Sequence, residues 1–475
     1  MNNYTIAIDL GESSVIAIAG CKGDDKELHI AAVAKRETRG VKAGRIENIA
    51  QVMEALSSVI AELEKRLNVK IQQAYGGISG EYIRNERHSE MVAVVEPNNG
   101  VSTVDVGALH NLMRNVLPPD ADSILEYTPQ NYVVDNKQEE RSPVGTFGHT
   151  LSSTFNFILC ENEALKRLGY AFKQSGINLK RCFPNAVTAA EAVLTADEME
   201  AGVAVVDLGE GMTNVTIFYR GTLRYIASIP MGGSALNSDI RSLMIQEKSI
   251  ESVKRKYGVA MSEHADAGSI TVEGRTSRET RSIPLHNLAV AIQERLTDIT
   301  IFVHREIRDA GFNHRLPYGV VLTGGGALLR SVDDLFRRNL ELEVRIGSPE
   351  EAVGKESHDL VSSPEFATVV GLLKRGVEMD SKGVGRPCTV EEESEDSDFK
   401  QKLEEQMRQS SNPKSETAEP TQTNKPKQEG EGEKVSKKES SSKDKQPKEK
   451  RRGFWESMIE KMNDLFSSDD NDTKL

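Results

Sequence analysis

Apolar residues occur in short runs separated by polar turns at the start of the chain. The runs YTIAIDL (4–10), SVIAIAGC (14–21) and LHIAAVAKR (28–36) have the length and β-branched content of buried strands. Over 47–68 the apolar spacing changes to three or four residues, which predicts a helix with one buried face. Its apolar positions are Ile49, Met53, Leu56, Ile60, Leu63 and Leu67.

The strand pattern returns in the second half of the chain. Residues 202–230 again read as a strand ending in Asp-Leu-Gly, a turn and two further strands, so this unit occurs once around Asp9 and once around Asp207. An internal duplication is the simplest account. A third unit of strand, glycine turn and helix is predicted at 318–340, followed by a strand-like segment at 342–348.

A small α+β insert is predicted between the two halves. A helix is expected over 104–116, with Ser102 or Thr103 as its N-cap and Pro118-Pro119 after its end. Its strands are expected at 91–95, 132–134 and 154–159.

The composition becomes polar after the last globular segment. Residues 378–450 are rich in Ser, Glu, Lys, Gln and Pro, and they hold too few apolar side chains to offset the entropy of ordering them, so we expect a disordered linker. A last amphipathic helix is predicted over 451–467, with Arg451 and Arg452 at its basic start. Its apolar stripe is Phe454, Trp455, Met458, Ile459, Met462, Leu465 and Phe466.

Charge and cysteine content narrow the class of protein. With 60 Lys+Arg against 73 Asp+Glu, the net charge of −13 argues against sequence-independent nucleic-acid binding. The four cysteines have no metal-ligand spacing and fit a reducing cytosol. The N-terminus lacks the features of a secretory signal, and no apolar run approaches the roughly 20 residues of a membrane span. A membrane-associated protein of this sequence is therefore expected to lie on the membrane surface.

The two Asp-Leu-Gly turns suggest a polyphosphate clamp. Glycines at 11, 209 and 211 allow close backbone approach, and hydroxyl residues follow them. Asp9 and Asp207 are suited to hold Mg²⁺ through its water shell. An ordinary hairpin turn is the alternative at either position, but two copies in a duplicated fold favour the clamp. The candidate residues are Asp9, Gly11, Ser13, Ser14, Asp207, Gly209, Gly211, Thr213 and Asn214.

Two further glycine-rich turns belong to the candidate site. Gly232 and Gly233 precede a predicted helix. Gly324, Gly325 and Gly326 lie between a strand and the predicted start of a helix, where the backbone can approach a base and a sugar and the helix N-terminus favours an anion. Taken alone, TGGG is equally an ordinary strand–helix loop.

These motifs resemble a known superfamily. The set AIDLGESS, VAVVDLGEGMTN, IPMGG and VVLTGGGALL is similar to the actin–DnaK–sugar-kinase ATPases. Within that superfamily the chain resembles the FtsA family of bacterial cell-division proteins, through AGRIENIAQV, YGGISGEYI, TPQNYVVD…SPVG and VRIGSP…EFATVVGLLKRG. The resemblance covers residues 4–376 and the terminal helix, while the linker has no family motif.

The resemblance implies an α/β, two-lobed actin-like ATPase fold of duplicated ribonuclease-H-like domains, with ATP and Mg²⁺ between the two Asp-Leu-Gly turns. ESVKRKYG resembles the family's adenosine-side helix and makes Glu251 and Lys254 candidate contacts; a solvated helix face is the alternative there. The implied organisation is a first lobe at 1–84 and 161–200, an interaction subdomain at 85–160 and a second lobe at 201–377, whose closing segment returns to the first lobe. The linker follows at 378–450 and the amphipathic helix at 451–467.

Three departures from the superfamily pattern bear on catalysis. Glu210 stands where glycine is usual, and its carboxylate would repel phosphate if it pointed inward. Asn214 replaces an acid. The stretch CFPNAVTAAEAV offers Phe183 where a Glu or Gln commonly positions water, and Glu191 lies too far along to be a convincing substitute. Nucleotide binding with at most slow hydrolysis is expected.

The resemblance also implies partners and a location. FtsA-like function means self-assembly into an actin-like filament, recruitment of the tubulin-like FtsZ to the cytoplasmic face of the inner membrane at the division site, and contact with later divisome proteins. The terminal stripe with its basic flank is typical of an in-plane membrane helix, although docking on a protein groove is the alternative. Seven partly buried apolar side chains contribute roughly 10 kcal/mol before the cost of ordering, so single anchors are weak and filaments bind through avidity.

Three other functions share parts of the pattern. A sugar or acetate kinase needs a clear catalytic base, a DnaK-type chaperone needs a β-rich peptide-binding domain, and a pilus-assembly adaptor has no need of the terminal helix. Each is less consistent with the sequence than the FtsA-like reading.

Overall fold

The computed structural model describes residues 4–137, 139–273 and 280–381. The predicted linker at 378–450 begins too early, because residues 378–381 belong to the last described helix. The rest of the linker and the amphipathic helix at 451–467, with its nine candidate membrane residues, lie outside the described residues. Within the described ranges, no helix is both long enough and apolar enough to cross a membrane.

The first half of the chain builds a mixed five-stranded sheet. Its strands follow the order β11-β6-β1-β2-β3. The β1–β2 and β2–β3 pairs are antiparallel hairpins, whereas β6 runs parallel to β1 and β11 runs parallel to β6. The strands are β1 (Thr5–Leu10), β2 (Ser14–Lys22), β3 (Leu28–Glu37), β6 (Gln73–Ile78) and β11 (Asn178–Pro184).

The second half repeats this topology, which confirms the predicted duplication. The order is β14-β13-β12-β17-β18, with two antiparallel hairpins followed by two parallel pairings. The strands are β12 (Val203–Leu208), β13 (Thr213–Tyr219), β14 (Thr222–Ile229), β17 (Val320–Thr323) and β18 (Val344–Ile346).

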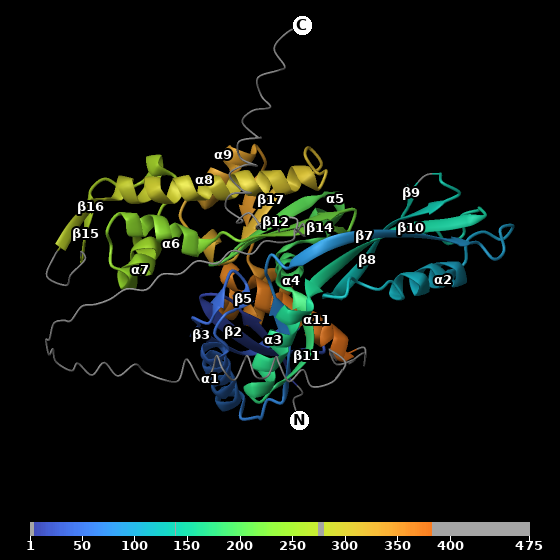
Figure 1. The fold of residues 1–475 in the computed structure, drawn as a ribbon, viewed down its shortest axis with the longest axis horizontal. Helices are drawn as coiled ribbons and strands as arrows, with labels where there is room; N and C mark the ends of the chain where they lie inside the picture. The colour runs from blue at the N-terminus through green and yellow to red at the C-terminus, as the bar shows by residue number, and fades with distance from the viewer. Residues whose placement is uncertain (1–3, 138, 274–279, 382–475) are drawn as a thin grey trace, which may run out of the picture. The chain divides into compact units, whose positions relative to one another are not determined.

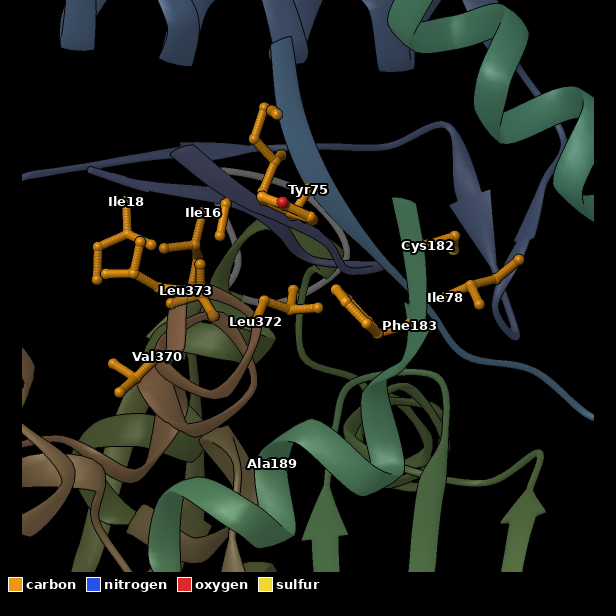
Figure 2. Close-up of a cluster of buried hydrophobic side chains, with 14 of the residues drawn as sticks. Ile16, Ile18, Tyr75, Ile78, Cys182, Phe183, Ala189, Val370, Leu372 and Leu373 are labelled. Carbon is orange, nitrogen blue, oxygen red and sulfur yellow. The ribbon is translucent and has the colours of Figure 1, made fainter. Parts of the chain in front are cut away.

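Helices from distant parts of the sequence cover the first sheet. The last described helix, α11, packs on β1, β2 and β6 and crosses α4. Figure 2 shows Val370, Leu372 and Leu373 among the side chains of this core, together with Phe183 and Tyr75. These helices are α1 (Ile49–Leu67), α3 (Asn162–Gln174), α4 (Asn185–Val193) and α11 (Ala367–Ser381).

Asp380 ties the end of α11 to the first sheet. Its carboxylate accepts hydrogen bonds from Thr5 Oγ1 and Tyr75 Oη, each at 2.7 Å, and from Lys180 Nζ. Burial alone would raise the pKa of Asp380, but these three donors hold it below its usual value.

The long helix α8 lies along the second half and packs on α6, α9 and β13 (Figure 1). The helices here are α5 (Ala196–Ala201), α6 (Gly233–Ser242), α7 (Glu247–Tyr257), α8 (Leu285–Asp309), α9 (Val332–Leu340) and α10 (His358–Val361). The short paired strands are β15 (Ser269–Glu273) with β16 (Thr280–Pro284), and β4 (Val41–Lys42) with β5 (Arg45–Ile46).

The predicted α+β insert is a four-stranded antiparallel sheet with one helix on one face (Figure 1). Ser102 caps that helix in a reciprocal pair of hydrogen bonds with Asp105, which confirms one of the two predicted caps. The strand order is β7-β10-β8-β9. The elements are β7 (Ile83–Ala93), α2 (Thr103–Arg114), β8 (Asp122–Val134), β9 (Glu139–Glu140) and β10 (Thr150–Glu161).

Candidate functional site

Both Asp-Leu-Gly motifs form the same hairpin turn. After β1, the amide of Gly11 donates to the carbonyl of Ser14 at 3.0 Å. After β12, the amide of Gly209 donates to the carbonyl of Met212 at 2.9 Å. Each turn therefore leaves an aspartate at the end of a buried strand, as the duplication predicts.

Asp9 is a half-buried carboxylate that accepts a hydrogen bond from Asn185 Nδ2 at 2.9 Å. Burial and the negative charge of Asp207 raise the pKa of Asp9 to about 7, and the Asn185 hydrogen bond offsets only part of this effect. Asn185 lies at the start of α4 and comes from the CFPNAV stretch, where sequence reasoning considered Phe183 and Glu191 instead.

Asp207 has an amide partner of its own. Its Oδ2 accepts from Asn214 Nδ2 at 3.3 Å, and burial raises its pKa to about 6. Asn214 is buried, and its Oδ1 accepts from Ser79 Oγ at 3.0 Å and Ser228 Oγ at 2.8 Å. The structure thus places Asn214 as a residue that positions Asp207 and links both halves of the chain.

The aspartate pair fits a hydrated Mg²⁺. Among the described residues neither carboxylate has an ion-pair partner, and both pKa values are raised. A cation near them would therefore offset the cost of burying two negative charges and the repulsion between them. No group of three or more potential ligands for a metal occurs in the described part of the chain. Mg²⁺ suits such a site because it commonly keeps several waters and takes one or two carboxylates together with phosphate oxygens.

The two hairpins approach each other through Glu12, a residue that sequence reasoning did not select. Its Oε2 accepts from the amide of Ala43 at 2.6 Å and lies where a β-carbon on Gly211 would be. Burial raises the pKa of Glu12, although the Ala43 hydrogen bond opposes that shift. A side chain at position 211 would therefore displace the Glu12 carboxylate from its place between the two turns.

The hydroxyl residues of the motifs have separate roles. Ser13 is exposed, and its carbonyl accepts from Thr38 N at 3.1 Å. Ser14 begins β2. The Thr213 hydroxyl is buried and donates to the carbonyl of Met231 at 2.8 Å, so it holds the following loop in place.

Gly232 and Gly233 support the second hairpin. The amide of Gly233 donates to the carbonyl of Gly209 at 3.0 Å. A β-carbon on Gly232 would lie 2.5 Å from that same carbonyl oxygen, so no larger residue fits. Gly233 is the first residue of α6, as expected, but its amide is already used within the protein.

Glu210 points toward α6 and α7. Its Oε1 accepts from Asn237 Nδ2 at 3.0 Å, and its Oε2 lies 3.7 Å from Lys254 Nζ. Lys254 also pairs with Glu251 at 2.7 Å. Burial alone would raise the pKa of Glu251, but hydrogen bonds from Arg255, Lys254 and Asn237 lower it to about 2. The predicted adenosine-side residues and Glu210 thus form one charged network.

The glycine triplet differs from prediction. Gly324 has a φ of +80° and packs against Asp207, and Gly326 packs against Leu208, which brings the loop to the second hairpin. Gly325 has open space on its side-chain side. However, the expected helix start is wrong: a 3₁₀ turn covers Gly325–Leu328, and α9 begins only at Val332.

The physical reason for the delayed helix lies in the intervening backbone. Ser331 has a left-handed φ of 62°, which a continuous helix cannot accommodate. The preceding Arg330 forms a bridge with Val259, and its carbonyl accepts from Ala260 N at 2.8 Å. The segment therefore joins the end of α7 before it enters α9, and it presents no α-helix N-terminus at the triplet.

Glu191 is not part of the site. Its carboxylate accepts from Arg375 Nε and Nη2, both at 2.6 Å, and burial raises its pKa to about 7. Phe183 stacks with Tyr75 in the core. Neither side chain takes the place of a water-positioning residue.

Duplicated mixed sheets, two Asp-Leu-Gly hairpins joined through Glu12, and a glycine loop packed on the second hairpin define an actin-like fold. A solved structure titled "PilM-PilN type IV pilus biogenesis complex" has this fold, with a TM-score of 0.55 and 18% identity over 79% of this chain and 99% of that one.

The family follows from the sequence comparisons. The model "Cell division protein FtsA" matches residues 204–371, and "SHS2 domain inserted in FTSA" matches 80–159, so together they span more than half of the chain. Cell division protein FtsA of Pseudomonas aeruginosa is 29% identical over 80% of this chain and 90% of its own. The Escherichia coli K12 protein is 28% identical over 80% and 91%. The chain belongs to the FtsA family.

Asn214→Asp tests the positioning role of this side chain. The change removes the donor to Asp207 and adds a carboxylate beside it, so we expect the free energy of unfolding to fall by about 2–3 kcal/mol at pH 8 and by less at pH 5. Urea unfolding at both pH values measures it. Asn313→Asp, the same change in an exposed loop, serves as the control. An equal loss at both pH values would contradict the electrostatic explanation.

Proposed function

We propose that this cell-division protein binds ATP with Mg²⁺, assembles into actin-like filaments and tethers FtsZ to the cytoplasmic face of the inner membrane at the division site. The observation that carries the nucleotide part is the pair Asp9 and Asp207, whose raised pKa values and lack of described ion-pair partners call for a cation. Membership of the FtsA family supports the division role.

The residues have distinct roles in this proposal. Asp9 and Asp207 would hold the hydrated Mg²⁺, which would neutralise phosphate charge when bound. Asn185 and Asn214 orient the two carboxylates. The backbone of the two hairpins would face the phosphates, while Gly325 and the network of Glu210, Glu251 and Lys254 would lie toward the nucleoside.

Slow hydrolysis is part of the proposal. The side chain that contacts Asp9 from α4 is the amide of Asn185, which cannot act as a general base. Glu191 on the same helix is engaged by Arg375. The nucleotide is therefore proposed to control assembly more than to be consumed rapidly.

The terminal helix is proposed to anchor filaments to anionic membranes through its apolar stripe and basic flank. The tether would also bring the protein to the later divisome proteins. Because each helix is a weak anchor, assembly and membrane binding are expected to reinforce each other.

Liposome co-sedimentation tests these points together. With Mg²⁺ and ATP, the full chain should pellet with anionic vesicles, and Trp455→Glu with Phe466→Glu should reduce the pelleted fraction at least five-fold. Ser457→Glu with Asn463→Glu adds the same charge on the polar face and should pellet much more than the stripe variant. Equal pelleted fractions of the two double variants would contradict the proposal that the apolar stripe binds the membrane.

Nucleotide dependence is measured separately from membrane binding. In the absence of vesicles, light scattering should increase with ATP and Mg²⁺ and remain at baseline with EDTA. Equal light scattering with ATP and Mg²⁺ and with EDTA would contradict the proposal that ATP controls assembly. The proposal for membrane binding would not be affected.

A further inference from the structure

The two hairpins carry an acidic residue at the same position. Both motifs read Asp-Leu-Gly-Glu, so Glu12 and Glu210 are equivalent in the duplicated turns. Their carboxylates point in different directions. Glu210 accepts from Asn237 Nδ2 and lies 3.7 Å from Lys254 Nζ, on the side of α6 and α7. Glu12 reaches the opposite hairpin, where its Oε2 takes the place of a β-carbon on Gly211. One acid therefore leaves the space between the turns, and the other occupies part of it.

A fixed backbone amide holds the Glu12 carboxylate there. Ala43 N donates to Glu12 Oε2 at 2.6 Å. Ala43 and Gly44 have φ values of 45° and 76° and join β4 to β5 in a two-residue turn, the conformation that tight hairpins favour. A β-carbon on Gly44 would overlap the carbonyl of Ser79, and Tyr82 Oη lies 2.8 Å from the carbonyl oxygens of both residues. The turn is thus anchored on the first half of the chain, with its amide aimed at Glu12.

The Glu12 carboxylate is poorly neutralised. Within the described ranges it has no ion-pair partner. Burial raises its pKa, and neither the Ala43 hydrogen bond nor the charge of Lys42 cancels this shift. Asp9 and Asp207, on the strands that lead into the same two turns, already repel each other. A phosphate entering between the turns would meet a further negative charge in a partly buried place, where water screens charge weakly.

The order of residues across the site indicates which phosphate meets Glu12. The proposed nucleoside contacts Glu251 and Lys254 lie beside Glu210, on the second hairpin. Gly211 follows Glu210, and Glu12 lies across from Gly211 on the first hairpin. A nucleotide with its nucleoside near Lys254 would pass the second hairpin before it reaches Glu12. The phosphate farthest from the sugar is therefore the one that this carboxylate opposes.

We propose that Glu12 is a specificity-determining residue of the nucleotide site and makes it prefer a nucleoside diphosphate to a triphosphate. The role of Glu12 rests on the proposed nucleotide function and adds a charge preference to it. A triphosphate would bind only with Glu12 displaced from the Ala43 amide. Its binding would therefore break the contact that joins the first hairpin to the β4–β5 turn, whereas a diphosphate would leave this contact in place.

Isothermal titration calorimetry with the full chain, Mg²⁺ and either ADP or the slowly hydrolysed analogue AMPPNP tests this proposal. The wild type should bind ADP about five-fold more tightly than AMPPNP. Glu12→Gln keeps the length of the side chain and an acceptor for the Ala43 amide but removes the charge. It should bind AMPPNP roughly ten-fold more tightly than the wild type does, and ADP with little change, because the repulsion acts on the terminal phosphate.

Two further variants make the measurement specific. Glu47→Gln makes the same charge change at an exposed residue directly after β5 and should leave both affinities within about two-fold of the wild type. Glu12→Ala removes the carboxylate and its contact with Ala43, so it should lose the preference for ADP as Glu12→Gln does. Circular dichroism checks the fold of each variant. If Glu12→Gln does not fold, Glu12→Ala decides.

The contrary results separate the role of Glu12 from the proposed function. If the wild type and Glu12→Gln bind both nucleotides with the same ratio of affinities, the role of Glu12 is wrong and the nucleotide site stands. Equal tightening of both ligands in Glu12→Gln leads to the same conclusion, since the effect would not concern the terminal phosphate. If none of the proteins binds either nucleotide, the proposed nucleotide function is itself wrong, and the role of Glu12 falls with it.

Discussion

Asp9→Asn should stabilise the ligand-free protein at pH 8 and remove its stabilisation by Mg²⁺ and ATP. The pKa of Asp9 is raised from 3.8 to about 7 in the folded protein. As the pH rises between these two values, Asp9 ionises in the unfolded chain but stays protonated in the folded protein, so the wild type loses stability. The amide variant does not ionise and can still accept from Asn185. We expect a gain of about 2 kcal/mol at pH 8, after allowance for solvent screening, and no gain at pH 4.

Thermal unfolding from pH 4 to 8, with and without Mg²⁺ and ATP, measures both effects. The comparison is the difference between variant and wild type, because other groups titrate in both proteins. Asp25→Asn is the control: its carboxyl is exposed and its pKa is lowered, so the variant should show no stabilisation at pH 8. A loss of stability at pH 8 in Asp9→Asn would mean that the carboxylate has a compensating partner in solution.

Gly371→Ala should destabilise the protein by roughly 2–4 kcal/mol despite the better helix propensity of alanine. Gly371 lies in α11 where that helix crosses α4, and a β-carbon there would overlap the carbonyl of Thr188. Backbone cannot rotate aside like a side chain, so the two helices must separate and disturb the core shown in Figure 2.

Gly169→Ala provides the matched comparison. Gly169 lies within α3, and a β-carbon at this position meets nothing within 4 Å. The same substitution should therefore stabilise the protein by about 0.5–1 kcal/mol. Chemical unfolding measures both variants. Similar effects of the two changes would show that the α4–α11 crossing can relax.

The sequence predicted the architecture well because strands and turns are encoded locally. The two Asp-Leu-Gly hairpins, the antiparallel hairpin strands that flank them and the Ser102 cap depend on residues close together in the sequence, whereas the parallel pairings of β1 with β6 and of β12 with β17 do not. The helix α1 shows a limit of this reasoning. Val52 and Val59 are fully buried, whereas Met53 and Leu67 are only partly buried, because the face of a helix is decided by what packs against it.

The hydrogen-bond partners of the site residues could not be predicted from the sequence. Asn185 contacts Asp9 across 176 positions, and Ser79 contacts Asn214 across 135. Such long-range contacts can be predicted only when the order of the strands and helices in space is known. Local pattern also misplaced the start of the helix after Gly324, because the bridge between Arg330 and Val259 is a tertiary interaction. The roles of the predicted site residues in nucleotide binding stay predictions.

The end of α11 has a mechanical consequence. Asp380 is fastened to Thr5, Tyr75 and Lys180, one residue before the last residue of the helix. If the tail binds the membrane as proposed, a force on it would act first on these three hydrogen bonds and next on the packing of α11. Only after these contacts break would a strand separate from the sheet. Under that proposal, the attachment point would be fixed to the first sheet through these side chains, and a force on the tail would be shared among β1, β6, β11 and α11.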